Sequence, residues 1–282
     1  MPTSEELKAG QRADWDAVAG AWEKWDAFQE AHTRPISEWL CRAASLSPGA
    51  RVLDLASGSG QPAFTAAELV RAGGWVVATD IAPEMVNVLR RRIVAGGINN
   101  MEAQVMDMES MSLPDASFDA VTCRWGFMFP PDPVKALAES RRVLRPGGRL
   151  ALAVWDLPAK NAWLSAFVAA INEVSPPAAP PDPKALGPFR LCDRDQLEGF
   201  LRSAGFSGPS LESVPFSFEF DSGEGWWEFV FEIAAPVRNR ILALDAGAQA
   251  KVRQLVLAQA EAYRSGGKIK LPAANLCAWA EK

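Results

Sequence analysis

Short apolar segments alternate with helical segments through the middle of the chain. Apolar runs predict buried strands, and these fall at residues 52–55, 75–80 and 101–106, with a fourth before Cys123 and a fifth before Trp155. Helical patterns separate the runs, at residues 62–70, 83–96 and 133–143. Strands separated by helices form a parallel sheet wound on both faces through right-handed crossovers. We therefore expect an α/β fold with a doubly wound sheet.

The pattern changes on both sides of this core. Further helices are expected at residues 4–31 (one or two), 35–46, 160–173, 193–205 and 224–264. Further strands are expected at residues 211–220 and 268–279, and a proline-rich loop at 175–183. We expect one domain over residues 1–282. It would comprise an N-terminal helical cap (1–46), a cofactor-binding core (47–156) and a C-terminal half (157–282) with a helical lid insertion at about 221–266.

A glycine turn follows the first strand, in the stretch Asp54-Leu55-Ala56-Ser57-Gly58-Ser59-Gly60. Gly58 and Gly60 let the backbone bend sharply and let a ligand approach without a Cβ in the way. Backbone amides at such a turn and at the start of the next helix favour an anionic or strongly polar group. A single glycine turn is a weak signal, because ordinary tight turns share it.

An acidic residue at the end of the second strand strengthens the signal. Asp80 lies twenty residues after Gly60, at the carboxyl end of the neighbouring parallel strand. A carboxylate there can accept hydrogen bonds from two ribose hydroxyls. Asp80 also precedes a helix that begins with an early Pro and Glu, so the alternative role is a helix N-cap. Both roles can hold at once.

These motifs resemble the class I S-adenosylmethionine-dependent methyltransferases, and more narrowly the small-molecule group similar to the ubiquinone and menaquinone C-methyltransferases. The similarity rests on the glycine turn, on Thr79-Asp80-Ile81-Ala82-Pro83-Glu84-Met85, on Asp107-Met108-Glu109 and on Leu144-Arg145-Pro146-Gly147-Gly148. It covers about residues 12–156. It implies a Rossmann-like, mostly parallel, seven-stranded sheet with an antiparallel last strand.

The resemblance also implies a cofactor, S-adenosyl-L-methionine, which leaves as S-adenosyl-L-homocysteine. The residues that it places at the cofactor are Asp54, Ala56, Ser57, Gly58, Gly60, Gln61, Asp80, Ile81, Met85, Asp107, Met108 and Arg124. Asp107 would accept from the adenine amino group, with a turn residue as the alternative. Trp15 and Trp22 match the family's aromatic lid. The family usually has glycine at the position of Ala56, whose methyl group narrows the first turn.

The acceptor site is less defined by the sequence. The loop that follows the fourth strand brings Trp125, Phe127 and Phe129 to the crevice edge of the sheet. Trp226 and Trp227 lie in the C-terminal insertion, which would form a lid and substrate pocket. Core packing is the alternative for all five aromatic residues. His32, the single imidazole of the chain, is a weak candidate for a general base and is equally consistent with a surface position.

Composition excludes several classes of protein. The formal net charge of −5 leaves no basic footprint for nucleic acid. Four cysteines without paired spacing indicate reduced thiols, and one histidine leaves no zinc site, so no metal is expected. No apolar run approaches the ~20 residues that span a bilayer, and the N-terminus lacks a signal peptide pattern. We expect a soluble, cytoplasmic enzyme of unspecified oligomeric state.

Three functions fit these observations. The first is methyl transfer to a small, largely apolar acceptor, at carbon or oxygen. The second is a nicotinamide-dependent oxidoreductase, which the glycine spacing disfavours because no third glycine follows Gly60. A reductase Tyr-x-x-x-Lys pair is also absent, since Lys268 follows Tyr263 by five positions. The third is a non-catalytic protein that binds S-adenosylmethionine, which the departure at Ala56 leaves open.

Overall fold

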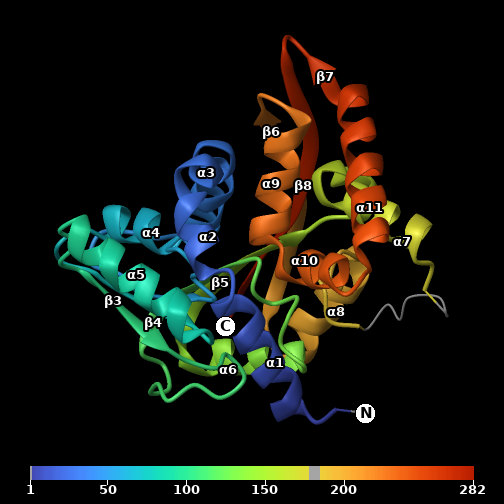
Figure 1. The fold of residues 1–282 in the computed structure, drawn as a ribbon. Coiled ribbons are helices and arrows are strands. Elements are labelled where there is room, and N and C mark those ends of the chain that lie inside the picture. Colours follow the sequence, from blue (N-terminus) through green and yellow to red (C-terminus); the bar gives the residue numbers. More distant parts are fainter. Residues whose placement is uncertain (1, 178–184) are drawn as a thin grey trace.

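The computed structural model describes residues 2–177 and 185–282. A single mixed sheet runs through this part of the chain (Figure 1). Its strand order is β3 (Met101–Val105), β2 (Trp75–Asp80), β1 (Arg51–Leu55), β4 (Phe118–Arg124), β5 (Leu144–Trp155), β8 (Lys268–Glu281) and β6 (Ser207–Phe220). The first five of these are parallel, and β8 is antiparallel to both of its neighbours.

This arrangement confirms the predicted fold class, with one addition. A two-residue strand, β7 (Arg264–Ser265), pairs with the start of β8 and lies off the path of the other seven. The last strand inserts between β5 and β6, so its neighbours come from different parts of the sequence. The strand order reverses between β1 and β4, which is the point where ligands bind in doubly wound sheets.

Alternating side chains of the central strands bury against helices on both faces. Val52, Val76 and Ala78 pack with α4 (Ala63–Val70) and α5 (Pro83–Ala95). Leu53 and Val77, one position along, belong to the large cluster on the other face, which includes residues of α6 (Pro133–Val143) and α8 (Arg194–Ser203). Because both faces are covered, the strands are mostly apolar, which is why they appear in the sequence as short apolar runs.

The N-terminal segment forms three helices, α1 (Ser4–Asp16), α2 (Ala19–Lys24) and α3 (Asp26–Ala43). The helix expected to begin at Pro35 is therefore the second half of α3, with the proline inside it. A proline in a helix interior costs about 3 kcal/mol. In α3 the residues on both sides of it are buried, Thr33 before and Ile36 and Leu40 after. Their burial against the sheet offsets this cost, so tertiary packing overrides the local preference.

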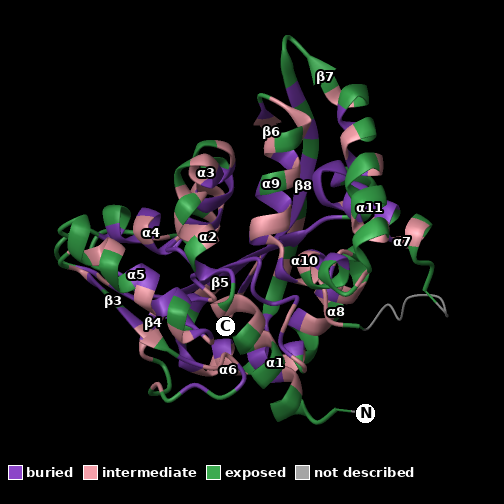
Figure 2. Cartoon of the chain, viewed as in Figure 1, coloured by how far each residue is buried: buried purple, intermediate pink, exposed green. Residues whose placement is uncertain are grey.

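The C-terminal half adds a helical layer beside the long β6–β8 pair (Figure 1). Its elements are η1 (Pro158–Lys160), α7 (Ala162–Val174), α9 (Gly223–Ile233), α10 (Ala235–Leu242), α11 (Ala246–Ala260) and η2 (Glu261–Tyr263). Figure 2 shows buried residues along the faces where α7, α9 and α11 meet. Most of the predicted proline-rich loop, residues 178–183, lies outside the described residues.

The cap and the insertion meet each other although about 200 residues separate them. Trp22 Nε1 donates to the Ile233 carbonyl at 3.0 Å. The Lys24 ammonium lies 2.7 Å from Glu228 and 2.8 Å from Glu232. These contacts join α2 to α9. The two helical segments together cover the carboxyl edge of the sheet at the strand-order reversal.

Candidate functional site

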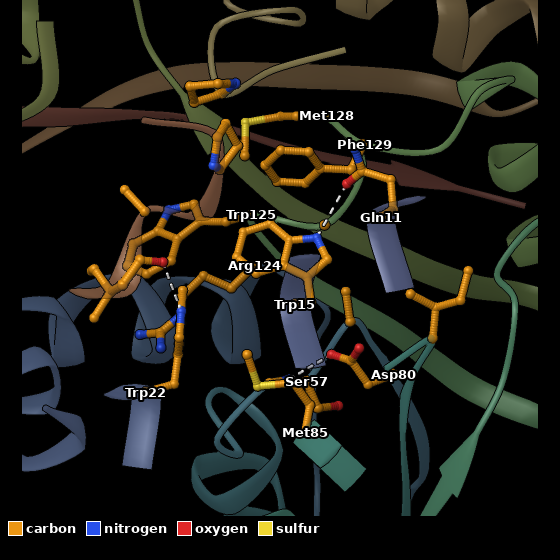
Figure 3. Close-up of a pocket in the computed structure, with 18 of the residues that line it drawn as sticks. Gln11, Trp15, Trp22, Ser57, Asp80, Met85, Arg124, Trp125, Met128 and Phe129 are labelled. Carbon is orange, nitrogen blue, oxygen red and sulfur yellow. Dashed lines mark hydrogen bonds between the residues drawn. The ribbon is translucent and has the colours of Figure 1, made fainter. Parts of the chain in front are cut away.

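A cavity of about 1330 Å³, counted with its mouth, opens at the carboxyl ends of the parallel strands. Most residues expected at the cofactor line it: Trp15, Trp22, Ala56, Ser57, Gly58, Gln61, Asp80, Ile81, Met85, Asp107, Met108 and Arg124. In Figure 3, Ser57, Asp80 and Met85 lie at one end of the cavity. Trp125, Met128 and Phe129 lie at the other end. The cavity thus has a polar end at the glycine turn and an aromatic end beneath the insertion.

The glycine turn and Asp80 form one hydrogen-bonded unit. The amide of Gly58 donates to Asp80 Oδ2, and the amide of Ala82 donates to Oδ1, both at 3.0 Å. Asp80 therefore holds the backbone at the start of α5 while it lines the cavity. A carboxylate has about four acceptor sites, so each oxygen keeps a lone pair for a ligand. The N-cap prediction for Asp80 is wrong, because Ala82 is the N-cap residue of α5 and no side chain caps the helix. Asp80 instead holds the amide of this N-cap residue, and its predicted ligand role remains geometrically possible.

Gly58 and Gly60 are needed for different structural reasons. Gly58 has φ +51° and lines the cavity, where an added Cβ would lie 3.7 Å from the Trp22 ring. Gly60 has φ +122°, and an added Cβ would lie only 2.1 Å from the Phe64 ring. Gly60 does not line the cavity. Its role in this structure is to let α4 pack against the turn.

Asp54 lies beneath the turn and is fully buried. Its Oδ1 accepts from the Thr122 hydroxyl at 2.6 Å, and no described residue hydrogen-bonds to Oδ2. Burial raises the pKa of Asp54 to about 7, although the hydrogen bond from Thr122 opposes the shift. Asp54 does not line the cavity, so it acts on a ligand only through its charge or through an intervening group.

Ala56, where the family has glycine, adopts φ +51°. An L-residue in this left-handed region costs roughly 1–2 kcal/mol. The methyl group is accommodated by Gly126, where an added Cβ would lie 2.6 Å from Ala56 Cβ. The alanine at residue 56, where the family has glycine, is thus matched by a glycine at residue 126 in the loop that follows β4. Both residues line the cavity.

We expect the substitution Ala56→Gly to raise the free energy of unfolding by about 0–1.6 kcal/mol. Relief of the left-handed strain favours the variant, while the greater freedom of glycine in the unfolded chain offsets about 0.4–1 kcal/mol of it. Urea denaturation measures the change. The matched control is Ala66→Gly, in the interior of α4, which should destabilise the protein by about 1 kcal/mol. Equal destabilisation in both variants would contradict the strain assigned to Ala56.

A cluster of charged side chains ties α1 to Asp107 and Glu109, which follow β3. Lys8 Nζ lies 2.7 Å from Asp107 Oδ2 and 2.8 Å from Glu109 Oε2. Burial lowers the pKa of Lys8, but hydrogen bonds to the two carboxylates outweigh it and raise the pKa above its usual value. Asp107, which is expected to contact adenine, therefore also forms an ion pair with the N-terminal helical cap. The sequence carries no signal for this role of Lys8, since it is one charge among many on an amphipathic helix.

Arg124 extends from the end of β4 and is buried, with 6% of its surface exposed. Its guanidinium donates to the Thr33 and Ser37 hydroxyls on α3, at 2.8 and 3.2 Å. It also lies over the Trp125 ring at 4.4 Å. No carboxylate of the described residues is within ion-pair distance of it. Burial lowers its pKa to about 10, and the charge of Glu30 opposes this shift.

Gln29 adds a second donor close to Arg124. It lies one helical turn before Thr33 on α3, is 2% exposed and lines the cavity. Its Nε2 has no hydrogen-bond partner among the described residues. A buried guanidinium without a counter-ion and a buried amide without an acceptor therefore occur together on one wall. Nothing in the local sequence pattern distinguishes Gln29 from a solvated helix residue.

The aromatic residues expected at the acceptor divide into two groups. Trp125 and Phe129 line the cavity, whereas Phe127, Trp226 and Trp227 do not. Phe127 is 1% exposed and belongs to the core cluster. Trp226 Nε1 donates to the Trp163 carbonyl at 2.8 Å, and Trp227 stacks on Phe167. The core-packing alternative therefore describes these three residues.

His32 also lies away from the cavity. Its Nδ1 is 2.8 Å from the Phe28 carbonyl, and its Nε2 accepts from the Glu219 amide at 3.2 Å. Both ring nitrogens therefore have backbone partners within the protein. The structure gives His32 a role in joining α3 to β6. Trp155 and Trp163, which the sequence did not single out, line the cavity instead.

The fold and the site together define a nucleotide-binding α/β domain, with a glycine turn after β1 and an acid at the end of β2. Residues 53–152 match a family model described as a methyltransferase domain. A demethylmenaquinone methyltransferase of Thermus thermophilus is 39% identical over 130 residues, 44% of this chain and 57% of that one. An aklanonic acid methyltransferase of Streptomyces is 42% identical over 117 residues, 42% of this chain and 53% of that one.

Solved structures agree on the fold. A crystal structure of a putative methyltransferase from Bacillus halodurans superposes with a TM-score of 0.56 at 23% identity, over 87% of this chain and 98% of that one. The chain spans about half the length of the curated relatives that it matches. The methyltransferase resemblance that the motifs predicted is thus confirmed over residues 53–152.

The described residues contain no group of three or more His, Cys, Asp or Glu side chains placed to hold a metal ion. No helix among them is both long enough and apolar enough to cross a membrane.

Proposed function

We propose that this chain transfers the methyl group of S-adenosyl-L-methionine to a small, largely apolar acceptor. The observation that carries the proposal is that the Gly58 turn, Asp80 and Arg124 all line the same cavity. The matching family model and the two similar methyltransferases support the same reaction. The relatives act on different acceptors, so their names support the reaction more than the acceptor.

The donor groups of the cavity fit both halves of the cofactor. Asp80 would accept from the ribose hydroxyls, and Asp107 from the adenine amino group, with Ile81, Met85 and Met108 beside the nucleoside. Arg124 and the unpartnered Nε2 of Gln29 would bind the carboxylate of the methionine end. A carboxylate would supply the counter-ion and the acceptor that these two groups lack within the protein.

The proposed reaction asks little chemistry of the side chains. The sulfonium of the bound cofactor supplies an activated methyl group and a neutral leaving group. The protein aligns the acceptor with that methyl group and excludes water, and orientation alone can contribute about 7–11 kcal/mol. Trp15 and Trp22 close the cavity from the cap, while Trp125 and Phe129 form a wall at the aromatic end. The acceptor atom would be carbon or oxygen.

Titration calorimetry of the full chain tests cofactor choice. We expect S-adenosylhomocysteine to bind at micromolar concentration and NADH and NADPH not to bind. Incubation with methyl-labelled cofactor and a panel of aromatic and polyketide-like acceptors then tests transfer. Binding of a nicotinamide dinucleotide without binding of either S-adenosyl compound would overturn the proposal. Cofactor binding without transfer to any aromatic, enolic or carboxylic acceptor would leave a non-catalytic binding protein as the better description.

The ionisation of Asp80 gives a pH-dependent prediction. Burial raises its pKa to about 6 in the free protein, although the amides of Ala82 and Gly58 oppose the shift. Hydrogen bonds from ribose hydroxyls favour the charged form, so binding lowers this pKa and releases a proton below pH 6. We therefore expect the affinity for S-adenosylhomocysteine to fall as the pH drops through about 6, approaching tenfold per pH unit.

Calorimetry between pH 5 and 8 measures this dependence, and a pair of buffers with different ionisation enthalpies measures the proton release. The matched control is Asp80→Asn, which cannot titrate and should bind weakly at every pH. A dependence that persists unchanged in this variant would assign the titration to another group and contradict the prediction.

A further inference from the structure

Trp125 combines a strained backbone with a position on the cavity wall. Its φ is +65°, in the left-handed region that bulky L-residues rarely adopt. It follows Arg124 at the end of β4, and the two side chains lie side by side in Figure 3. Strained residues persist where the surrounding contacts over-determine them, and they cluster at functional sites. The contacts of Trp125 therefore indicate the function that its strained conformation serves.

Three contacts hold Trp125 in this conformation. Its backbone amide donates to the Ala153 carbonyl at 2.7 Å. Its ring stacks on Trp155, with centroids 4.5 Å apart and planes 19° apart. Stacking fixes the plane of the indole but lets the ring turn within that plane. The third contact removes this freedom, because Trp125 Nε1 donates to Asn275 Oδ1 at 3.2 Å.

Asn275 makes this bond from a position that would otherwise favour an apolar side chain. It lies on β8, directly opposite Trp155 in the antiparallel pairing with β5, and it is fully buried. It does not line the cavity, and its Nδ2 has no hydrogen-bond partner among the described residues. Burying an amide nitrogen without a partner destabilises the folded state. The hydrogen bond to Trp125 is therefore what accounts for an asparagine at this position.

The indole of Trp125 in turn fixes the plane of the Arg124 guanidinium. The guanidinium donates to the hydroxyls of Thr33 and Ser37, and both bonds come from Nη1. A planar group held at one nitrogen can still turn about that nitrogen. The centre of the Trp125 ring lies 4.4 Å from the guanidinium carbon, so the ring covers one face and removes this freedom. A carboxylate binds best to the edge of a fixed guanidinium, through two parallel hydrogen bonds.

We propose that Asn275 is a positioning residue for the amino-acid half of the cofactor, on which it acts through Trp125 and Arg124 without touching the ligand. The inference rests on the proposed function, because it requires that Arg124 binds the methionine carboxylate. Asn275 orients the indole, the indole fixes the guanidinium, and the guanidinium is thus oriented before the cofactor arrives. Such preorganisation raises affinity, because less freedom is lost on binding. The nucleoside half, assigned to Asp80, does not depend on it.

The test is Asn275→Leu, which replaces the amide with an apolar side chain of similar volume. Leucine cannot accept from Trp125 Nε1, but it also removes the unpartnered Nδ2, so the variant should fold. Titration calorimetry of the full chain measures the binding of S-adenosylhomocysteine and of 5′-methylthioadenosine, which lacks the amino-acid half. We expect Asn275→Leu to weaken S-adenosylhomocysteine binding at least about fivefold and to leave the affinity for 5′-methylthioadenosine within about twofold.

Trp125→Phe removes the same hydrogen bond from the other side. It should also weaken S-adenosylhomocysteine binding selectively, and adding Asn275→Leu to it should change neither affinity by more than about twofold. The matched control is Asn100→Leu, which changes an asparagine outside the cavity whose Nδ2 donates to the Ala67 and Arg71 carbonyls. This control should leave the ratio of the two affinities unchanged.

Equal weakening of both ligands by Asn275→Leu, or unchanged binding of both, would overturn the inference. A full effect of Asn275→Leu in the Trp125→Phe background would also overturn it, because the asparagine would then act by another route. Thermal denaturation checks the folding of each variant, and if Asn275→Leu does not fold, Trp125→Phe alone must show the selective loss. Binding of S-adenosylhomocysteine to the unmodified protein and to Arg124→Met is measured first, so failure of the proposed function is seen separately.

Discussion

The substitution Asp80→Ala is expected to weaken S-adenosylhomocysteine binding by more than about 150-fold. The reason is the loss of two hydrogen bonds from ribose hydroxyls to a charged acceptor, worth about 1.5–3 kcal/mol each. The position of Asp80 at the end of β2, with its oxygens already oriented by two backbone amides, makes both bonds available to a ligand without rearrangement. Titration calorimetry at pH 7.5 measures the effect.

The fold should survive this substitution. Asp80 is 7% exposed, and burial of its charge raises its pKa, so the ionised group is costly to the native state. Removing it relieves this cost while leaving the Gly58 and Ala82 amides without an acceptor. We expect a loss in unfolding free energy of about 1–3 kcal/mol. A folded Asp80→Ala protein with unchanged affinity would place the nucleoside elsewhere and contradict the ribose assignment.

The second large effect is expected for Arg124→Met. This change removes the buried cation assigned to the carboxylate of the methionine end. Loss of a charged hydrogen bond should weaken S-adenosylhomocysteine binding by about 10- to 150-fold, at 1.5–3 kcal/mol. The nucleoside 5′-methylthioadenosine lacks the amino-acid portion, so its affinity should stay within about twofold. The same calorimetric titration, run with both ligands, separates the two ends of the cofactor.

A matched control is Arg91→Met, which changes an exposed arginine paired with Glu23 at 2.6 Å. It should leave both affinities unchanged, since exposed ion pairs contribute about 0–1 kcal/mol. Because methionine suits the buried site of Arg124 at least as well as an unpaired guanidinium does, the variant should fold. An equal loss of affinity for both ligands in Arg124→Met would assign the arginine to general cavity structure instead.

The N-terminal helical cap and the C-terminal insertion together cover the cavity that would hold the cofactor and the acceptor. The cap brings Trp15 and Trp22 over the polar end, and the insertion brings Ile233 and Val237 over the aromatic end. The hydrogen bond from Trp22 Nε1 to Ile233 joins the two halves directly. Both reactants would thus be enclosed by elements from opposite ends of the sequence, which excludes water from the transfer step.

Much of the fold was predictable because local pattern and burial agree in the central sheet. Most residues of β1 and β2 are apolar, and both faces of these strands are covered, so the local sequence pattern predicted them. The predicted helix at 133–143 coincides with α6. The helix start predicted at Pro35 was wrong, because contacts of α3 with distant strands outweigh the helix-breaking preference of proline.

The candidate site was predictable to the extent that backbone geometry encodes it. Gly58 and Asp80 are set by a turn that needs a positive φ and by the end of a parallel strand, and both features are visible in a single sequence. Aromatic residues carry no such constraint. Trp226 and Trp163 have the same side chain, yet the indole N–H of Trp226 bonds to the backbone of Trp163, while that of Trp163 has no partner among the described residues.

By itself, the sequence determined the doubly wound sheet, the glycine turn and the acid at the end of the second strand, because each depends on short-range periodicity or on a backbone angle. The tertiary structure alone decided which aromatic residues line the cavity and that Lys8 closes on Asp107 and Glu109. It also decided that Arg124 pairs with hydroxyls and with no carboxylate, and that Gln29 Nε2 and Trp163 Nε1 have no acceptor among the described residues. These features depend on side chains that meet across 90 to 200 residues of chain, and no local pattern records how they pack.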